Sequence, residues 1–201
     1  LQYNAAPLSD GIGLLGMYYD DDDFDFSVAP SVIRIDPVVD FDWNNDSPDP
    51  LLPVDFFAVR WTGFVQPLFT EDLTFRTITD DGVRLWVNGS LIIDQWIPQG
   101  ATEWTGELFL EAGKKYPIRM EFYELGGGAV AQLRWSSAHL PSTVIPAKQL
   151  FPPLSFLPAK AIGVVWEDAN YNGLFDALEN PIGGATVLRL DSLGNLIDGW
   201  Q

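Results

Sequence analysis

The stretch "TFRTITDDGVRLWVNGSLIID", residues 74–94, contains the pattern that decides the fold class. Apolar and polar residues alternate on both sides of Asn88-Gly89, a pair that favours a two-residue β-hairpin because both residues tolerate positive φ. Two acidic residues, Asp80 and Asp81, stand side by side where the first strand is expected to end. The stretch therefore predicts paired β-strands and raises the question of what two adjacent carboxylates do there.

The same period of two dominates from residue 56 to about residue 136, with almost no helical periodicity. Phe57, Val59 and Trp61 share one face of an expected strand, and turns rich in glycine and asparagine separate the strands. Many short strands joined by such turns predict an all-β fold, a β-sandwich or barrel.

Composition narrows the classes of partner. The chain has 201 residues with 28 Asp and Glu against 11 Lys and Arg, giving a formal charge of -17. This charge opposes binding to nucleic acids and anionic membranes and favours cations. No run of 18 apolar residues exists, so membrane insertion is not expected. The start "LQYNAAPLSD" has neither an initiator Met nor a signal-peptide layout, which favours a processed product or a fragment.

The chain divides into unequal parts. We expect an N-terminal extension over residues 1–10, a main domain over 11–152, a proline-rich linker over 153–159 and a small module over 160–201. A lone unit of about 40 residues seldom buries a sufficient core without a metal or a partner. The small module is therefore expected to be incomplete or stapled by an ion.

That module contains "DANYNGLFDALE", residues 168–179, which matches the EF-hand calcium loop. Asn180-Pro181 follows the loop and opposes an exiting helix, so the loop is EF-hand-like but flanked by expected strands. The six expected calcium ligands are Asp168, Asn170, Asn172, the carbonyl of Leu174, Asp176 and Glu179.

Six ordered blocks of the main domain resemble a known family, the PA-fourteen (PA14) domain of anthrax protective antigen, yeast flocculins and bacterial adhesins. The resemblance covers roughly residues 11 to 152 and implies a β-sandwich. The blocks are "GLLGMYY", "FAVRWTGFV", the stretch quoted above with Trp96, "GELFLEAGKKYPIRMEFYE", "GGGAVAQLRWSS" and "VIPAKQLFP".

The resemblance also implies a role for the paired carboxylates. In lectin members of the family, two adjacent Asp joined by a cis peptide bond chelate calcium, whose remaining positions accept vicinal sugar hydroxyls. Consecutive residues of an extended strand point to opposite faces, so Asp80 and Asp81 need such a bond or a sharp bend to hold one ion. The simpler alternative is a turn leading into Gly82.

The loop that completes the site in lectin members corresponds to residues 124–129. It lacks the Asn or Asp of several members, so the resemblance implies ligands from the glycine carbonyls or the Glu124 carboxylate. We expect sugar contacts from Glu124, Gly126, Gly127 and Gly128, although the glycines equally suit a tight turn.

The C-terminal module, residues 160–199, resembles the start of a B-type repeat of serine-aspartate-repeat surface adhesins. This implies a calcium-stiffened β-sandwich stalk of about twice the length. Its open sheet would be completed by missing strands or by a neighbouring copy through strand addition.

Three further features have plain interpretations. The acidic run that contains Asp20 to Asp23 and Asp25 is expected to be a solvated loop, with a third calcium site as the alternative. His139 has no obvious catalytic partner in the sequence. Trp96 is expected to pack in the core rather than stack on a sugar.

These observations predict a calcium-dependent carbohydrate-binding or adhesion module of an extracellular or cell-surface bacterial multidomain protein, with glycans as partners and no enzyme activity. The alternative is a structural surface or filament subunit that calcium rigidifies without binding sugar. An accessory module of a secreted glycosidase is a third possibility.

Overall fold

The computed structural model describes residues 10–153, 187–190 and 196–200. The chain forms two compact units, residues 1–157 and 158–201, and each is described by itself. The EF-hand-like loop over 168–179 lies outside the described residues, so its six expected ligands remain a prediction.

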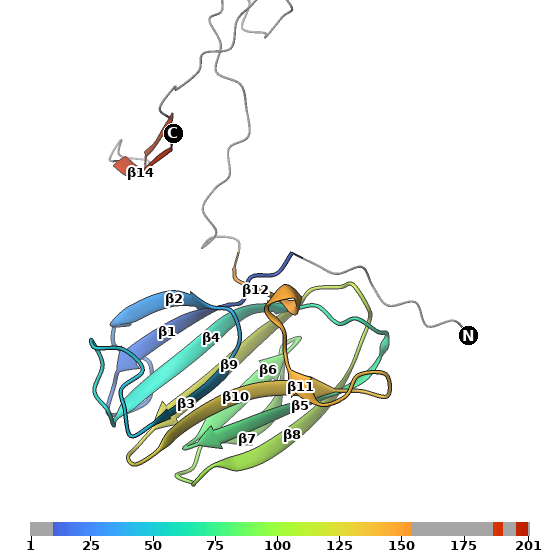
Figure 1. The fold of residues 1–201 in the computed structure, drawn as a ribbon, viewed down its shortest axis with the longest axis horizontal. Helices are drawn as coiled ribbons and strands as arrows, with labels where there is room; N and C mark the ends of the chain where they lie inside the picture. Colours follow the sequence, from blue (N-terminus) through green and yellow to red (C-terminus); the bar gives the residue numbers. More distant parts are fainter. Residues whose placement is uncertain (1–9, 154–186, 191–195, 201) are drawn as a thin grey trace, which may run out of the picture. The chain divides into compact units, whose positions relative to one another are not determined.

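The first unit is an all-β sandwich of two antiparallel sheets, as predicted (Figure 1). The larger sheet has the order β2-β1-β4-β9-β6-β7, with β12 also paired to β4. The smaller sheet has the order β11-β10-β5-β8, with β3 also paired to β10. The larger sheet comprises β1 (Leu14–Asp20), β2 (Val32–Asp36), β4 (Phe57–Val65), β6 (Val83–Val87), β7 (Ser90–Gln95), β9 (Tyr116–Glu124) and β12 (Leu150–Phe151). The smaller comprises β3 (Asp40–Asn44), β5 (Glu71–Asp80), β8 (Thr102–Leu110), β10 (Ala129–Ser136) and β11 (Thr143–Val144).

The strands follow the alternation of the sequence. Along β10, buried and half-buried residues alternate without a break, and most of β5 does the same. The predicted hairpin joins β6 to β7, and its turn residues Asn88 and Gly89 have φ of 51° and 79°. Positive φ at both positions is what a two-residue turn between twisted strands requires.

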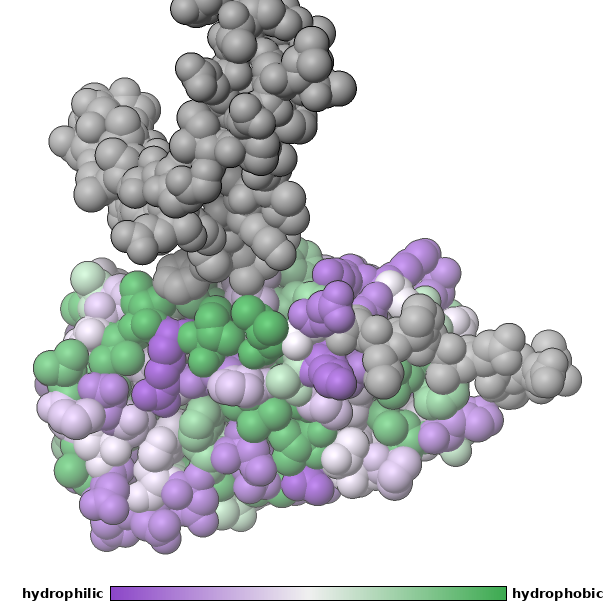
Figure 2. Space-filling model, turned by 45° about the horizontal axis from the view of Figure 1, so that its top comes forward, coloured by the Kyte–Doolittle hydropathy of each residue, from purple (hydrophilic) through white to green (hydrophobic). Residues whose placement is uncertain are grey.

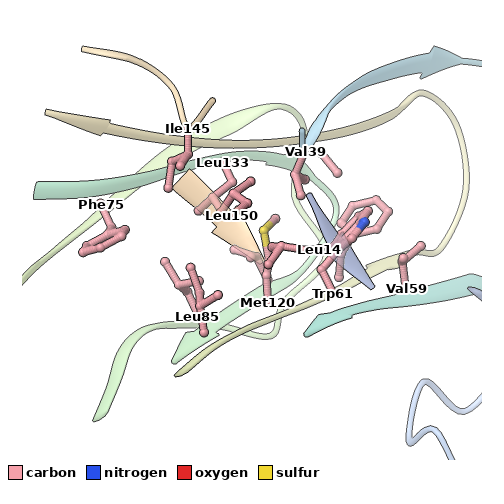
Figure 3. Close-up of a cluster of buried hydrophobic side chains, with 14 of the residues drawn as sticks. Leu14, Val39, Val59, Trp61, Phe75, Leu85, Met120, Leu133, Ile145 and Leu150 are labelled. Atoms are coloured by element: carbon pink, nitrogen blue, oxygen red, sulfur yellow. The ribbon is translucent and has the colours of Figure 1, made fainter. Parts of the chain in front are cut away.

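The core lies between the two sheets (Figure 3). Trp61 and Met120 from the larger sheet and Phe75 and Trp135 from the smaller sheet are fully buried. On the outside, hydrophobic and hydrophilic residues are interspersed over the face that Figure 2 shows. The inward faces of both sheets thus form one continuous apolar layer, which is the main source of stability in such a fold.

One acidic side chain is part of this core. Asp36 is 3% exposed and accepts hydrogen bonds from the Tyr18 hydroxyl at 2.6 Å and from Trp61 Nε1 at 2.7 Å. Arg34 Nε donates to the other carboxylate oxygen at 2.8 Å. Burial and the Asp36 carboxylate raise the pKa of Tyr18, so its hydroxyl remains a donor. The buried carboxylate therefore holds three donors in place.

In the second unit, β13 (Val187–Leu190) pairs antiparallel with β14 (Leu196–Trp200), and Val187 lies opposite Trp200. Both strands fall in segments that the sequence predicts as strands. Residues 191–195, between the two strands, lie outside the described residues.

The helical content of the described residues is a single 3-10 turn, Ala147–Gln149. Within these residues no helix has the length and apolar character needed to cross a membrane.

Four connections cross between the two sheets at one end of the sandwich, which we call the crossover end. They are residues 45–56, 81–82, 96–101 and 125–128. The strand register places them together, because Asp80 lies opposite Val130, Thr79 opposite Thr102 and Phe57 opposite Glu124. Residues far apart in the sequence therefore meet at this end.

The Asp36 network gives a first test of the fold. Asp36→Ala leaves the buried Tyr18 hydroxyl and Trp61 Nε1 without an acceptor, at a cost of roughly 1–3 kcal/mol each. We expect the free energy of unfolding in urea to fall by about 3 kcal/mol. Asp72→Ala, at an exposed position of β5, should change it by less than about 0.5 kcal/mol. Equal effects of the two substitutions would contradict this account of the core.

Candidate metal centre

The paired aspartates lie where the chain leaves the smaller sheet for the larger one. Asp80 is the last residue of β5, and its peptide bond to Asp81 is cis, as the family resemblance implies. A Cβ on the next residue, Gly82, would lie 2.2 Å from the Tyr123 ring, so only glycine fits the crossing at this point. The sequence Asp-Asp-Gly is thus matched to a tight passage against β9.

Asp81 joins two other crossovers. Its side chain is buried, and its Oδ1 accepts a hydrogen bond from the backbone N–H of Gln99 at 2.8 Å. Its Oδ2 accepts one from the backbone N–H of Leu125 at 2.9 Å. The carboxylate is therefore held in a fixed orientation between the 96–101 and 125–128 crossovers.

Gln99 strengthens this arrangement. Its Nε2 donates to the backbone carbonyl of Asp81 at 3.0 Å and to Thr79 Oγ1 at 3.2 Å. Its Oε1 accepts a hydrogen bond from Trp104 Nε1 at 2.9 Å. Both ends of the amide are thus used to fix the position of the cis-linked pair.

Glu124 is the third carboxylate of the cluster. It is 0% exposed, and neither of its carboxylate oxygens has a hydrogen-bond partner. One oxygen each of Asp80, Asp81 and Glu124 lies within 4.8 Å of the others. A buried carboxylate without a donor is costly, and a nearby cation is the usual compensation.

The electrostatics of the cluster lead to the same conclusion. Burial, followed by the charges of Asp81, Asp80 and Asp55, raises the pKa of Glu124 to about 8. The Gly126 amide opposes this rise, although it does not reach hydrogen-bond geometry with the carboxylate. Burial and the Asp81 charge also raise the pKa of Asp80, and a hydrogen bond from the Ala101 backbone opposes that shift. These carboxylates therefore repel one another where no cation lies between them.

The donor set fits a hard divalent cation. Carboxylate oxygens are the ligands that Ca²⁺ prefers. The cluster contains none of the thiolate or imidazole groups that softer metals prefer. Among the described residues, Asp80, Asp81 and Glu124 are the one set of three potential metal-ligating side chains whose ligand atoms lie close together. The Glu124 oxygens, which have no hydrogen-bond partner, add a second feature that a bound cation would satisfy.

The three glycines of the neighbouring loop form an exposed rim. A side chain at Gly126 or Gly127 would meet open space, and Gly127 has φ of 109°. The Gly127 N–H donates to Asp55 Oδ1 at 3.1 Å, which ties this rim to the 45–56 crossover. Of the four residues expected to contact sugar, Glu124 therefore lies with the aspartates, Gly126 and Gly127 are exposed, and Gly128 is half-buried.

The other candidates lie outside this cluster. Asp21 is buried and its Oδ2 accepts a hydrogen bond from the Phe26 N–H at 2.8 Å, whereas Asp25 accepts one from Ser27. Within the described residues the run from Asp20 to Asp25 brings no third metal-ligating group together with them. His139 Nδ1 lies 2.8 Å from Glu71 Oε2, in a contact that holds two surface segments together.

Trp96 is half-buried on the outer face of the larger sheet rather than in the layer between the sheets. Its ring lies 4.7 Å from the Tyr123 ring in an edge arrangement, and the Arg84 guanidinium lies 4.6 Å from its centroid. Its packing role is confirmed, in a second, smaller apolar cluster.

Gln99 and Asp55 were not predicted from the sequence. Both lie in crossovers that come near the aspartates only through strand pairing, and neither is part of a local motif. Gln99 stands between Pro98 and Gly100, whereas Asp55 stands between Val54 and Phe56, two residues after Pro53.

Comparison with known proteins assigns most of the chain. The family model of the PA14 domain matches residues 12–149. The chain is 48% identical over 152 residues to the anti-sigma-I factor RsgI3 of Acetivibrio thermocellus, which covers 76% of this chain and 23% of that protein. The chain thus spans about a quarter of the length of this curated relative.

Solved structures agree with this assignment. An anti-sigma factor domain-containing protein is 46% identical with a TM-score of 0.69, over 78% of this chain and 53% of that one. A structure described as the PA14 sugar-binding domain from an RTX adhesin shares the fold, with 20% identity and a TM-score of 0.61, over 71% of this chain and 99% of that one.

The buried, unpartnered carboxyl group of Glu124 gives a second test. In the cation-free protein at neutral pH, Glu124→Gln should raise the free energy of unfolding by about 1–3 kcal/mol, because it removes an unpartnered buried acid and adds an amide that can donate to the aspartates. The same substitution should reduce the increase in melting temperature that calcium produces. Thermal unfolding with chelator and with calcium measures both effects. A variant that is less stable than the wild type in chelator would contradict the assignment of Glu124 as a buried carboxyl group without a hydrogen-bond partner.

Proposed function

Residues 12–149 belong to the PA14 domain family, and on that basis we propose that this domain is a calcium-dependent glycan-binding module. The observation that carries the proposal is the fully buried, unpartnered carboxylate of Glu124 beside Asp80 and Asp81. Three converging carboxylates, one of which has no donor on either oxygen, are what a protein provides when a cation is the missing partner.

In this proposal Asp80, Asp81 and Glu124 hold calcium. The bound ion supplies positive charge and coordination positions that sugar hydroxyls can fill. The protein contributes orientation, because the backbone amides of Gln99 and Leu125 fix both oxygens of Asp81. The exposed Gly126 and Gly127 leave room for a ligand to approach, since side chains there would extend into open space.

Binding is favoured over catalysis by the same geometry. A retaining glycosidase places its two carboxyl groups roughly 5–5.5 Å apart across an open cleft, and an inverting one places them farther apart. In this cluster the three oxygens are closer, within 4.8 Å, and Glu124 is inaccessible to solvent. We therefore propose that the carboxylates bind an ion and perform no hydrolysis.

We further propose that the module senses glycans for a regulatory protein at the cell surface. This rests on the relatives with 46% and 48% identity, whose names describe anti-sigma factors. The RTX adhesin domain, at 20% identity, supports the fold alone. We therefore favour a sensory role over adhesion and over a filament subunit, and place the binding surface outside the cell.

A second calcium is proposed for the EF-hand-like loop. The spacing from Asp168 to Glu179 provides side-chain oxygens, a carbonyl and a closing Glu in the order that such loops use. This ion would stiffen the C-terminal module, as the resemblance to B-type repeats implies.

A glycan array with the full chain tests the central proposal. We expect binding to at least one glycan in millimolar calcium, its loss in chelator, and its loss in Asp80→Ala. Asp72→Ala, which removes the same charge from an exposed position near the start of β5, should bind as the wild type does. Calcium-induced stabilisation without any glycan bound at millimolar sugar would favour the structural alternative.

Calorimetric titration tests the two calcium sites separately. We expect about two calcium ions per wild-type chain, and about one for either Asp80→Ala or the double substitution Asp168→Ala with Glu179→Ala. A stoichiometry that is unchanged by the double substitution would exclude the EF-hand-like loop as a site.

A further inference from the structure

A pocket of about 380 Å³ lies on the outer face of the larger sheet, where Trp86 alternates with buried residues of β6. The pocket is lined by residues of β6, β9 and the hairpin turn, namely Trp86, Gly89, Pro117, Ile118 and Arg119. Trp86 stands five residues after Asp81, a span of about 16 Å in extended backbone. Gly89 leaves one side open, because a Cβ there would meet nothing within 4 Å. The pocket is therefore separate from the paired aspartates and accessible to a ligand.

Arg119 is held in a fixed position at the edge of this pocket. It lies opposite Trp86 in the register of β6 and β9, and its guanidinium carbon is 3.8 Å from the centroid of the Trp86 ring. Its Nε lies 3.6 Å from Glu121 Oε1. The Arg119 side chain is nevertheless 44% exposed, and its guanidinium makes no hydrogen bond to any residue that the structure describes. Stacking on an aromatic ring orients the planar guanidinium, and its terminal nitrogens are available to a ligand.

The strands around the pocket have a local excess of positive charge. β4, β6, β7 and β9 contain three arginines, Arg60, Arg84 and Arg119, and outside the metal cluster they contain two acids, Asp94 and Glu121. Arg84 Nε pairs with Asp94 at 3.0 Å, and Arg60 Nε pairs with Glu121 at 2.8 Å. Both acids therefore have a closer partner than Arg119. This cation can attract an anionic group although the whole chain has a formal charge of -17, because salt screens exposed charges beyond about 8 Å at physiological ionic strength.

We propose that this pocket is a second binding site, independent of calcium, for a sugar that carries a carboxylate, such as a hexuronate. The planar guanidinium of Arg119 matches a carboxylate through two parallel hydrogen bonds. Trp86 and Pro117 provide an apolar surface for the C–H groups of the ring, in the combination of apolar walls and a few polar groups that ligand pockets use. The open side at Gly89 leaves the ring hydroxyls and any linked sugars in water.

The pocket and the metal centre have different requirements. No acidic side chain lines the pocket, so a carboxylate meets no like charge on its walls and needs no metal ion to bind. That the ligand is a sugar rests on the proposed glycan binding of the domain. The position of the pocket and its independence of calcium rest on Arg119 and Trp86 alone.

Binding of hexuronates in chelator tests the pocket without the metal centre. Glucuronic acid and glucose differ at C6, as do galacturonic acid and galactose, and acetate supplies the carboxylate alone. We expect ligand-observed NMR of the full chain in chelator to show at least one hexuronate binding ten-fold or more tightly than its neutral parent and than acetate. Its affinity should fall several-fold between 0.15 M and 1 M salt, because the Debye length falls from about 8 Å to about 3 Å.

Matched variants locate the site. Arg119→Gln removes the guanidinium and should reduce hexuronate affinity in chelator ten-fold or more, whereas Arg119→Lys keeps the charge without the planar fork and should reduce it less. Arg84→Gln is the control, because Arg84 also stacks on a tryptophan, Trp96 at 4.6 Å, and lies on the same sheet, but it is paired with Asp94 and does not line the pocket. It should leave the affinity unchanged, and so should Asp80→Ala, which removes a ligand of the metal centre.

The outcomes separate this site from the proposed calcium-dependent function. Hexuronate binding in chelator that Arg119→Gln abolishes and Arg84→Gln retains would support the second site. Absence of hexuronate binding in chelator, or equal losses in the two arginine variants, would overturn it and leave calcium-dependent glycan binding intact. Acetate that binds as tightly as the hexuronates would overturn the assignment of a sugar. Hexuronate binding in chelator, without any glycan bound through calcium, would overturn the calcium-dependent function alone.

Discussion

A buried carboxylate with no hydrogen-bond donor is the constraint around which one end of this sandwich is built. Glu124 ends β9 in the interior, next to the cis-linked Asp80 and Asp81, and both of its oxygens lack a partner. Folding alone gives no reason for this placement, since an apolar side chain would pack there at lower cost. The cluster is therefore best understood as a site whose local instability is relieved by a cation.

The rest of the domain supplies the rigidity that such a site needs. The two sheets share one apolar core, and the crossovers that connect them are fixed at both ends by strand register. Asp81 then joins two crossovers by accepting hydrogen bonds from the backbone amides of Gln99 and Leu125. The Gln99 side chain also donates to the backbone carbonyl of Asp81. Carboxylates held in this way cannot move apart to relieve their repulsion, so the site is organised before any ion binds.

The sequence predicted the elements that depend on local pattern. Alternation gave the strands and their buried faces, Asn88-Gly89 gave the hairpin, and the family resemblance gave the cis-linked Asp80 and Asp81. The contributions of Gln99 and Asp55 were missed because they arise from strand pairing between distant segments, which leaves no local motif. Glu124 was named as a ligand candidate, but only the three-dimensional structure gives its complete burial. Because the glycine loop lacks the Asn or Asp of several family members, the sequence left either the glycine carbonyls or the Glu124 carboxylate as ligands, and the structure brings Glu124 together with the aspartates.

The family assignment covers residues 12–149, which include the three carboxylates of the cluster. Identity of 48% to an anti-sigma factor underlies the proposed sensory role, and the acidic cluster underlies the proposed cation site. The most direct test of the central claim is an anomalous-difference map from crystals grown with calcium. The account predicts a peak with oxygens of Asp80, Asp81 and Glu124 at about 2.3–2.6 Å. A map without a peak at this position, in which Glu124 instead accepts hydrogen bonds from protein or water, would contradict it.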